Sequence, residues 1–587
     1  MSGVDSDHVL NNGTVRLVDG RDCQGPYAAL SYCWGSDRDL TLTHESEERL
    51  REGLRIAKFP GTLRDAVVVT SRLGIRYLWI DAVCIFQDQE QHQDSRDDWA
   101  REAGRMRDVY RGAALTIEAA AASRGNEGFL RTRSSARPYC ALRWGIAIDK
   151  WVYLRPMFDI TDSQLIGTTI YTRGWTLQER LLAPRTLSFG VQQVSFECAN
   201  GFVDEAGRAT QLPRATESYL SKESMLQLRR DKGWLTTIWR SLQRTLGLPT
   251  VVTLFTISRK YEIGWTNQGE LRVPGGYWAT YFDYWRGIVE RFSQRQLTDM
   301  KDRLPALSGL ADEFRQATGS EYVAGMWKDE LLTSLAWTCG WVYNPVGAYQ
   351  DASNSVPPGC YAKCGDWPST IMPTEYIAPS WSWASVRGRV KFPVDSYQDS
   401  WRQVKHIARV SHVSTEPKYD TDLLGSLKSG TLTLETLFLE VPNPTVPCRD
   451  DFVLASLHSR IRTDDLRMTD SLASEYYQHH EPYDGQTFGL LQLLTTRYTA
   501  RPNTNQGLLY LILIESRKES GYRRLTCVNV AVDTLAQLEK EHFGHWKVAS
   551  DSDLEYQRDM QPELERMAAM SSEIVQAPWE RREVVLW

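Results

Sequence analysis

Histidine is scarce in this chain, and its distribution restricts the chemistry that the sequence supports. Ten histidines occur in 587 residues, and none lies between His92 and His406. The strongest motifs fall in that gap, so a Ser-His or Cys-His pair is excluded there unless His8, His44 or His92 folds back onto it. Chemistry in this segment therefore has to proceed without a neighbouring histidine in the sequence.

Long hydrophobic runs and basic blocks are also missing. The longest apolar run, from Leu508 to Ile514, is far shorter than the roughly 18 residues of a membrane span, and the polar N-terminus MSGVDSDHVLNNG lacks the apolar region of a signal peptide. With 68 Lys and Arg against 74 Asp and Glu, the net charge is −6. We therefore expect a soluble cytoplasmic protein with no membrane span and no nucleic-acid partner.

Cysteine occurs ten times, mostly as isolated residues in apolar contexts. This usage is typical of reduced core thiols rather than of a disulfide framework. Cys360 and Cys364 are the only close pair, and the nearest histidine is His406, so we expect no metal site. A thiol enzyme using Cys33 or Cys84 stays open, although apolar surroundings raise a thiol pKa and weaken this reading.

Aromatic residues, in contrast, are abundant. The 21 Trp and 26 Tyr indicate large aromatic cores or partner surfaces, and the chain is too long for a single core. The patterning predicts an α/β domain at 13–205, a mainly helical region at 213–340, a loop or linker at 341–375 and a β-rich C-terminal domain at 376–587. Within the last domain the alternating Trp381 and Trp383 predict one face of a strand packed into the core.

The first domain alternates strand and helix patterns. Strands are predicted at 27–32, 77–86 and 113–119, with helices at 62–73 and 95–110 between them. Thr62 with Asp65 three residues later predicts a helix N-cap, and Asp81 interrupts an otherwise apolar strand. This order predicts a parallel sheet flanked by helices, with ligands at the carboxyl ends of its strands.

The segment RGWTLQERLLAPR, from Arg173 to Arg185, contains the most informative spacing. Trp175 and Glu179 are four residues apart and share one face of a helix, with Leu182 continuing the stripe. A carboxylate beside an aromatic side chain is suited to holding sugar hydroxyls or stabilising a cationic transition state. The alternative is a structural helix in which Trp175 and Leu182 are buried and Glu179 pairs with an arginine. The arginines, which include Arg180, are candidates for phosphate contacts or for solvent exposure.

Three segments in order resemble the fungal heterokaryon-incompatibility (HET) domain. They are YAALSYCWG at 27–35, LRDAVVVTSRLGIRYLWIDAVCIFQD at 63–88 with WAREAGRMRDVY at 99–110, and RGWTLQERLLAPRTLSF at 173–189. The first strand with its loop, and Trp175 with Glu179, are also similar to the TIR domain, which has a flavodoxin-like sheet. The resemblance implies a fungal cytoplasmic protein of non-self recognition and regulated cell death, with a protein partner or self-association.

The TIR resemblance further implies cleavage of the nicotinamide N-glycosidic bond of NAD, which is then a substrate, and no cofactor. On this reading Glu179 is the catalytic carboxylate, and the substrate-binding residues are Ser31, Trp34, Gly35, Ser36, Asp37, Asp81, Asp88, Trp175 and Arg173. The competing hypothesis is an interaction module that recruits partners without chemistry. Loss of NAD consumption on replacement of Glu179 distinguishes the two.

Overall fold

The computed structural model describes residues 2–5, 13–35, 40–88, 91–132, 140–143, 151–154, 168–191, 193–205, 209–210, 222, 225, 228, 270–273, 277–339, 375–392, 402–420, 422–441, 488–498, 507–516, 521–532 and 580–587. The chain divides into two compact units. The first comprises 1–233, 295–298 and 305–313, and the second comprises 234–294, 299–304 and 314–587. The four-part division stays a prediction, and the expected linker lies outside the described residues except for Glu375.

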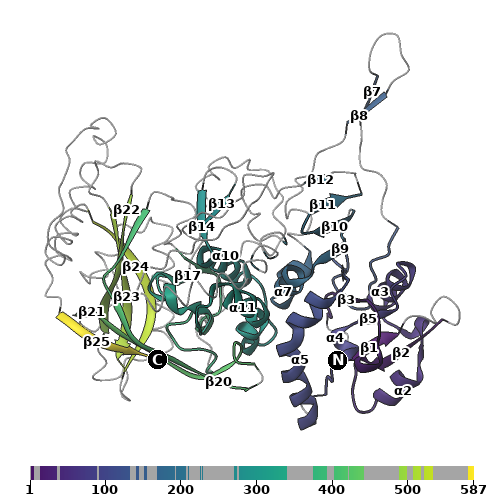
Figure 1. Ribbon diagram of the computed structural model, residues 1–587, viewed down its shortest axis with the longest axis horizontal. Coiled ribbons are helices and arrows are strands. Elements are labelled where there is room, and N and C mark those ends of the chain that lie inside the picture. The colour runs from purple at the N-terminus through teal and green to yellow at the C-terminus, as the bar shows by residue number, and fades with distance from the viewer. Residues whose placement is uncertain are drawn as a thin grey trace, which may run out of the picture. The chain divides into compact units, whose positions relative to one another are not determined.

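A mixed sheet of ten described strands forms the centre of the first unit (Figure 1). The strands are β1 (Ser2–Asp5), β2 (Thr14–Asp19), β3 (Tyr27–Ser31), β4 (Leu54–Arg55), β5 (Tyr77–Trp79), β6 (Leu115–Glu118), β9 (Arg185–Phe189), β10 (Val194–Cys198), β11 (Gly201–Asp204) and β12 (Ala209–Thr210). Their order is β12-β11-β10-β9-β6-β3-β5-β1-β2-β4. The four central strands β5, β3, β6 and β9 are parallel, as the sequence predicts, whereas the pairings outside them are antiparallel.

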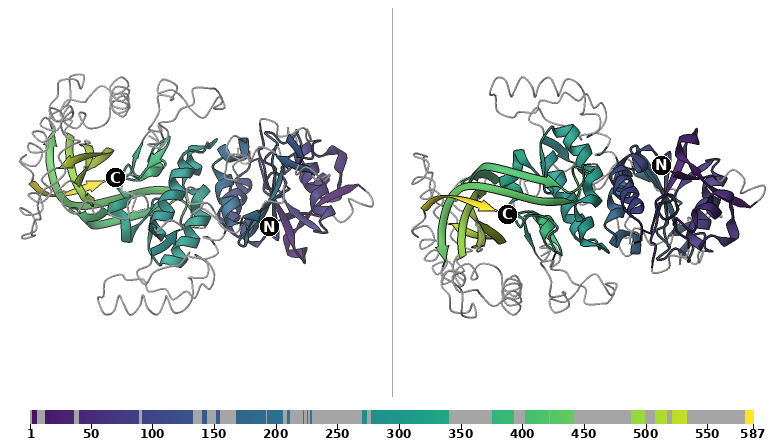
Figure 2. Two further views of the ribbon diagram at one scale, coloured as in Figure 1. Left: turned by 90° about the horizontal axis from the view of Figure 1, so that it is seen from above. Right: turned by 90° about the horizontal axis from the view of Figure 1, so that it is seen from below.

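The parallel strands follow the order 2-1-3-4 of flavodoxin-like sheets, because β5 lies on one side of β3 and β6 on the other. Right-handed crossovers in opposite directions place the connecting helices on opposite faces. Accordingly, α3 (Gly61–Arg72) covers one face, and α5 (Gln93–Gly112) with α7 (Trp175–Leu182) covers the other (Figure 2). The carboxyl ends of β3 and β6 therefore form a topological switch point, the usual location of a ligand in such sheets.

Two local predictions were wrong in detail. The strand that was expected to reach residue 86 ends at Trp79, and Asp81 instead begins the short helix α4 (Asp81–Cys84). Neither Thr62 nor Asp65 caps α3. The Thr62 hydroxyl donates a hydrogen bond to the carbonyl of Arg124, and Asp65 accepts the backbone N–H groups of 129 and 130. Both side chains hold the loop that follows β6 against α3.

The shorter elements of the first unit include the helices α2 (Glu47–Glu52) and α6 (Thr169–Thr172), the 3-10 turns at Gly20–Asp22 and Ile56–Lys58, and the hairpin of β7 (Cys140–Arg143) and β8 (Trp151–Leu154). No described helix in either unit is long and apolar enough to cross a membrane.

The second unit combines helices with an extensive antiparallel sheet. Its elements are β13 (Glu270–Val273), β14 (Tyr277–Thr280), α10 (Tyr281–Ser293), α11 (Pro305–Thr318, of which residues 305–313 belong to the first unit), β15 (Tyr322–Val323), β16 (Met326–Trp327), α12 (Leu331–Ser334), β17 (Thr338–Cys339) and β18 (Val390–Lys391), with 3-10 turns at Met300–Arg303, Lys328–Glu330 and Trp383–Ser385. The large sheet contains β19 (Arg402–His406), β20 (Arg409–Pro417), β21 (Leu427–Val441), β22 (Phe488–Tyr498), β23 (Gly507–Ser516), β24 (Tyr522–Val532) and β25 (Glu580–Leu586).

Pairing in this sheet closes on itself, because β22 pairs with β21 as well as with β23, and β23, β24, β25 and β21 pair in turn. The β-rich character predicted for the C-terminal part of the chain is confirmed. Aromatic residues contribute to the core of the second unit, in which five tryptophans are almost completely buried: Trp285, Trp327, Trp337, Trp381 and Trp383. Trp381 and Trp383 lie in the core as predicted, but they flank and begin a 3-10 turn instead of lying on a strand.

Candidate active site

Glu179 lies on α7, which packs against α5 and β3. Its side chain is only 5% exposed, so the helix directs a carboxyl group into the interior. The predicted stripe exists: Trp175 is half-buried at the helix start, where its ring meets Trp99 edge to face at 6.5 Å, and Leu182 is completely buried. The helix thus places an acid and an aromatic side chain on neighbouring turns, as the spacing predicts.

The surroundings of Glu179 raise its pKa to about 7. Burial is the largest cause, and the nearby carboxyl group of Asp81 acts in the same direction. The hydroxyl groups of Ser31 and Tyr110 and the guanidinium of Arg173 oppose the increase by stabilising the charged form. Near neutral pH this carboxyl group therefore exists in both protonation states, which is a common property of catalytic acids and bases.

Ser31 ends β3, at the carboxyl edge of the parallel strands. Its hydroxyl group lies beside Glu179, where it lowers the carboxyl pKa, but it makes no hydrogen bond of good geometry to any described residue although the side chain is 3% exposed. Buried polar groups are nearly always satisfied, so such an exception calls for an explanation. Tyr110, from α5, is better anchored because its hydroxyl donates to the carbonyl of Leu30 at 3.0 Å.

A second acid, Asp81, lies close enough to Glu179 to raise the pKa of the Glu179 carboxyl group. Trp34 donates its indole N–H to Asp81 Oδ2 at 2.9 Å, and the backbone N–H of Ala82 donates to Oδ1 at 2.7 Å. Burial raises the pKa of Asp81 to about 6, against the opposing effects of Arg173 and these hydrogen bonds. The loop after β3 and the turn after β5 are therefore joined through Trp34 and Asp81.

Arg173 supplies the positive charge for both acids. Its Nη1 donates to the carbonyl of Tyr32 at 2.7 Å, and its backbone carbonyl accepts a hydrogen bond from Arg295 at 3.1 Å. The guanidinium lowers the pKa of Glu179 and of Asp81. A single guanidinium thus acts on two carboxyl groups, and it only partly offsets the effect of burial, which leaves the pKa of Glu179 at about 7 and that of Asp81 at about 6.

Arg180 has a structural role in the same helix. It forms ion pairs with Glu118 at 3.0 Å and with Glu197 at 2.7 Å, and Ser188 hydrogen-bonds to the same Glu118. Glu118 is the register partner of both Ser31 and Ser188 on the neighbouring strands. This row of polar side chains fixes α7 on the sheet, so Arg180 is engaged within the protein. The side chain of Arg185 is exposed and reaches the carbonyl of Ala114.

The remaining predicted site residues are Gly35, Ser36, Asp37 and Asp88. Gly35 adopts a φ of +74°, and a Cβ there would lie 3.0 Å from Arg124, so this glycine shapes the turn after β3. Ser36 and Asp37 lie outside the described residues. Asp88 contacts His44 and Ser95, so its described partners are not those of Glu179.

Burial disfavours the two candidate thiols. It raises the pKa of Cys33 to about 11 and that of Cys84 to about 12, so both are protonated at neutral pH. Tyr110 is the site residue that sequence reasoning missed. Its position on the apolar face of α5 indicates only a core residue, and nothing in the local pattern places its hydroxyl beside an acid.

One protein-family model matches the part of the chain that contains this site. Residues 27–179 match the sequence model of the family described as Heterokaryon incompatibility protein (HET), a segment that runs from the first residue of β3 to Glu179 itself. The chain contains a HET domain. Neither the curated proteins nor the solved structures gave a match. The HET domain thus includes the parallel strands β3, β5 and β6, and Asp81, Tyr110, Arg173 and Glu179 all lie within the matched segment.

Proposed function

We propose that this heterokaryon-incompatibility-type protein hydrolyses the N-glycosidic bond between nicotinamide and ribose in NAD, with Glu179 as the catalytic carboxylate. The observation that carries the proposal is the buried Glu179 with a pKa of about 7 beside the carboxyl end of β3. The presence of a HET domain supports a role in non-self recognition. Loss of NAD in the cytoplasm of a fungal cell would then lead to regulated cell death.

The proposed reaction consumes one water molecule. The bond between ribose C1 and the nicotinamide nitrogen breaks, its electron pair leaves with nicotinamide, and water adds to C1, giving ADP-ribose and one proton. Because nicotinamide leaves as a neutral base, the leaving group needs no general acid. Positive charge develops on the ribose ring instead, and a nearby carboxylate stabilises it. Glu179 would supply this negatively charged carboxylate and would also hold the ribose hydroxyls.

The neighbouring side chains suit this role in different ways. The Ser31 hydroxyl lacks a good hydrogen bond and is free to accept or donate one to a ribose hydroxyl. Tyr110 and Arg173 limit how far the pKa of Glu179 rises, which keeps a useful fraction of carboxylate at neutral pH. Trp34, held by Asp81, would form part of the nucleotide contact.

Substrate access sets a further condition. Glu179 is 5% exposed, so a ribose ring reaches it only if neighbouring side chains move. We therefore expect the rate to depend on the assembly state of the protein, with self-association favouring the open arrangement. Measuring the rate over a range of protein concentrations tests this condition separately from the identity of the carboxylate.

The second candidate function is an interaction module without chemistry. The burial of Glu179 favours it, because a carboxyl group packed against Ser31, Tyr110 and Arg173 also serves as a polar element of the core. On that hypothesis NAD remains intact, and the biological phenotype is the same with glutamine at position 179.

Nicotinamide release by the purified full-length chain distinguishes these functions. We expect the wild-type protein to release nicotinamide and Glu179→Gln to be at least about 100-fold slower, the usual cost of removing a group that stabilises transition-state charge. Asp97→Asn is the matched control, because Asp97 is an exposed acid on α5 that hydrogen-bonds Gln93. Equal rates in wild-type protein and Glu179→Gln would exclude Glu179 as the catalytic group.

A further inference from the structure

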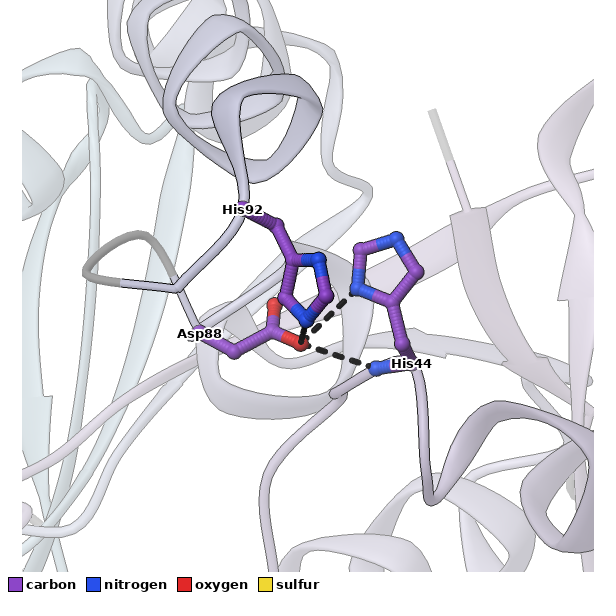
Figure 3. A group of neighbouring side chains, drawn as sticks. All are labelled: His44, Asp88 and His92. Carbon is purple, nitrogen blue, oxygen red and sulfur yellow. Dashed lines mark hydrogen bonds and ion pairs between the residues drawn. The ribbon is translucent and has the colours of Figure 1, made fainter.

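Two loops of the HET domain bring together side chains that the proposed NAD chemistry does not use. Leu42 and Phe86 form an isolated β-bridge, and the backbone N–H of Gln87 donates to the carbonyl of Leu42 at 2.8 Å. This pairing places His44, which precedes α2, beside Asp88, which follows α4. His92 lies immediately before α5 and completes the group (Figure 3).

The three side chains converge on one point. His44 Nδ1 lies 2.8 Å and His92 Nε2 lies 3.8 Å from the same atom, Asp88 Oδ2. One potential ligand atom from each residue falls within 4.8 Å of the other two. Tetrahedral ligands at about 2.0–2.1 Å from a zinc ion are about 3.3 Å apart, so the two measured distances lie on either side of the required spacing. Closing the site requires the two imidazoles, whose ring centroids are 4.1 Å apart, to turn so that both nitrogens face the ion.

A second layer of hydrogen bonds already orients these side chains. His44 Nε2 is 2.9 Å from Asp94 Oδ2, which leaves Nδ1 directed at the common point. Ser95 Oγ donates to Asp88 Oδ1 at 2.6 Å, and the backbone N–H of His44 donates to Oδ2 at 3.0 Å, so both bonds orient the carboxylate with Oδ2 toward the two imidazoles. A carboxylate behind a histidine is the usual support of a histidine that ligates a metal. This arrangement is independent of the distances among the three candidate ligands.

We propose that His44, Asp88 and His92 bind a zinc ion through Nδ1, Oδ2 and Nε2. Two imidazole nitrogens and one carboxylate oxygen are donors that zinc accepts, whereas magnesium and calcium prefer oxygen alone. Three protein ligands leave the fourth position open to water or a solute. When the ion binds, it replaces the proton between His44 Nδ1 and Asp88, which is released to solvent.

The surface beside His44 fits a cation with an open position. An open surface hollow of about 580 Å³ is lined by His44 and by the α2 side chains Glu47, Glu48, Arg51 and Glu52. Arg51 pairs with Glu47 at 2.9 Å, so Glu48 and Glu52 leave this hollow acidic. The zinc site is separate from the group around Glu179, because none of its three ligands is among the described neighbours that set the Glu179 pKa.

Metal binding to the full-length, tag-free and chelator-treated chain tests the proposal. We expect one zinc ion per chain by titration calorimetry, and a cobalt complex whose visible spectrum lacks a thiolate charge-transfer band. His92→Ala and His44→Ala should each weaken zinc binding by at least ten-fold, and Asp94→Asn by about ten-fold. His412→Ala, on an exposed position of β20, and Cys360→Ser should bind as the wild type does.

The outcome that overturns the proposal is equally specific. If no stoichiometric zinc binding occurs, or if His44→Ala and His92→Ala bind zinc as tightly as wild-type protein, the group is an ion-paired cluster only. Loss of affinity in Cys360→Ser but not in His92→Ala would place the zinc at the cysteine pair instead. Either result leaves the NAD hypothesis unaffected, since nicotinamide release is measured separately.

Discussion

Replacing Glu179 by glutamine should stabilise the first compact unit at alkaline pH while it removes the proposed catalytic group. The carboxyl pKa rises from 4.5 to about 7 on folding, mainly because the group is buried. This difference of about 2.5, at 1.36 kcal/mol per pKa unit, corresponds to about 3 kcal/mol. Glutamine has nearly the same shape and no charge, so it avoids this free-energy cost above pH 7. Any hydrogen bond that the amide fails to make reduces the gain in stability.

The sign of the pH dependence follows from proton binding. Between pH 4.5 and 7 the folded protein retains a proton on Glu179 that the unfolded chain has released. The stability of wild-type protein therefore falls as the pH rises through this window, whereas the contribution of position 179 is constant in Glu179→Gln. The difference in unfolding free energy between variant and wild type should be about 3 kcal/mol larger at pH 8 than at pH 4.5.

Urea denaturation at several pH values, read through hydrogen exchange of β3 and β6 peptides, measures this difference for the first unit alone. The wild type and the variant share all other titrating groups, so most of their contributions cancel. Asp81 is the exception, because its carboxyl group acts electrostatically on that of Glu179. A difference that stays constant from pH 4.5 to 8 would refute the claim that Glu179 is buried with a raised pKa.

Four other predictions concern activity and packing. The rate of nicotinamide release should increase about ten-fold from pH 6 to pH 8, because the active carboxylate of Glu179 titrates near pH 7; a pH–rate profile that is flat over this range contradicts its role. Trp34→Phe should raise the pKa of Asp81 above about 6 by removing a hydrogen bond to the charged form, as carboxyl ¹³C NMR titration would measure. Cys33→Ser should retain NAD consumption, and loss of activity in a folded Cys33→Ser protein would revive the thiol hypothesis. Gly325→Ala should destabilise the second unit by about 3 kcal/mol in urea denaturation, because residue 325 has a φ of +92° and a Cβ would lie 2.5 Å from a buried indole nitrogen; an unchanged midpoint would contradict this packing.

Periodicity and family resemblance predicted the parts of the fold in which local pattern and tertiary environment agree. The α7 helix is an example, because the spacing of Trp175, Glu179 and Leu182 defines the buried face directly. The predicted strand at 77–86 failed for a tertiary reason. Asp81 is held by the indole of Trp34, 47 residues away in the sequence, so the chain turns into α4 where the apolar pattern would continue a strand.

The site was predictable only in part for the same reason. Glu179 and Ser31 were identified from their motifs, but the raised pKa of Glu179 depends on burial and on Asp81 and Tyr110, which come from different elements. The approach of His44 to Asp88 depends on the bridge between Leu42 and Phe86, and single-sequence patterns do not indicate such a pairing. The absence of histidine between His92 and His406 was evident from the sequence, whereas the spatial proximity of His44 and His92 was not.

Oxygen-18 labelling tests the role of Glu179 most directly. When the full-length chain is incubated with NAD in H₂¹⁸O, we expect mass spectrometry to find the label on C1 of ADP-ribose, with free nicotinamide formed in equal amount, and no such product from Glu179→Gln. Labelled ADP-ribose formed equally well by Glu179→Gln, or NAD recovered intact from wild-type protein at every concentration, would contradict the account.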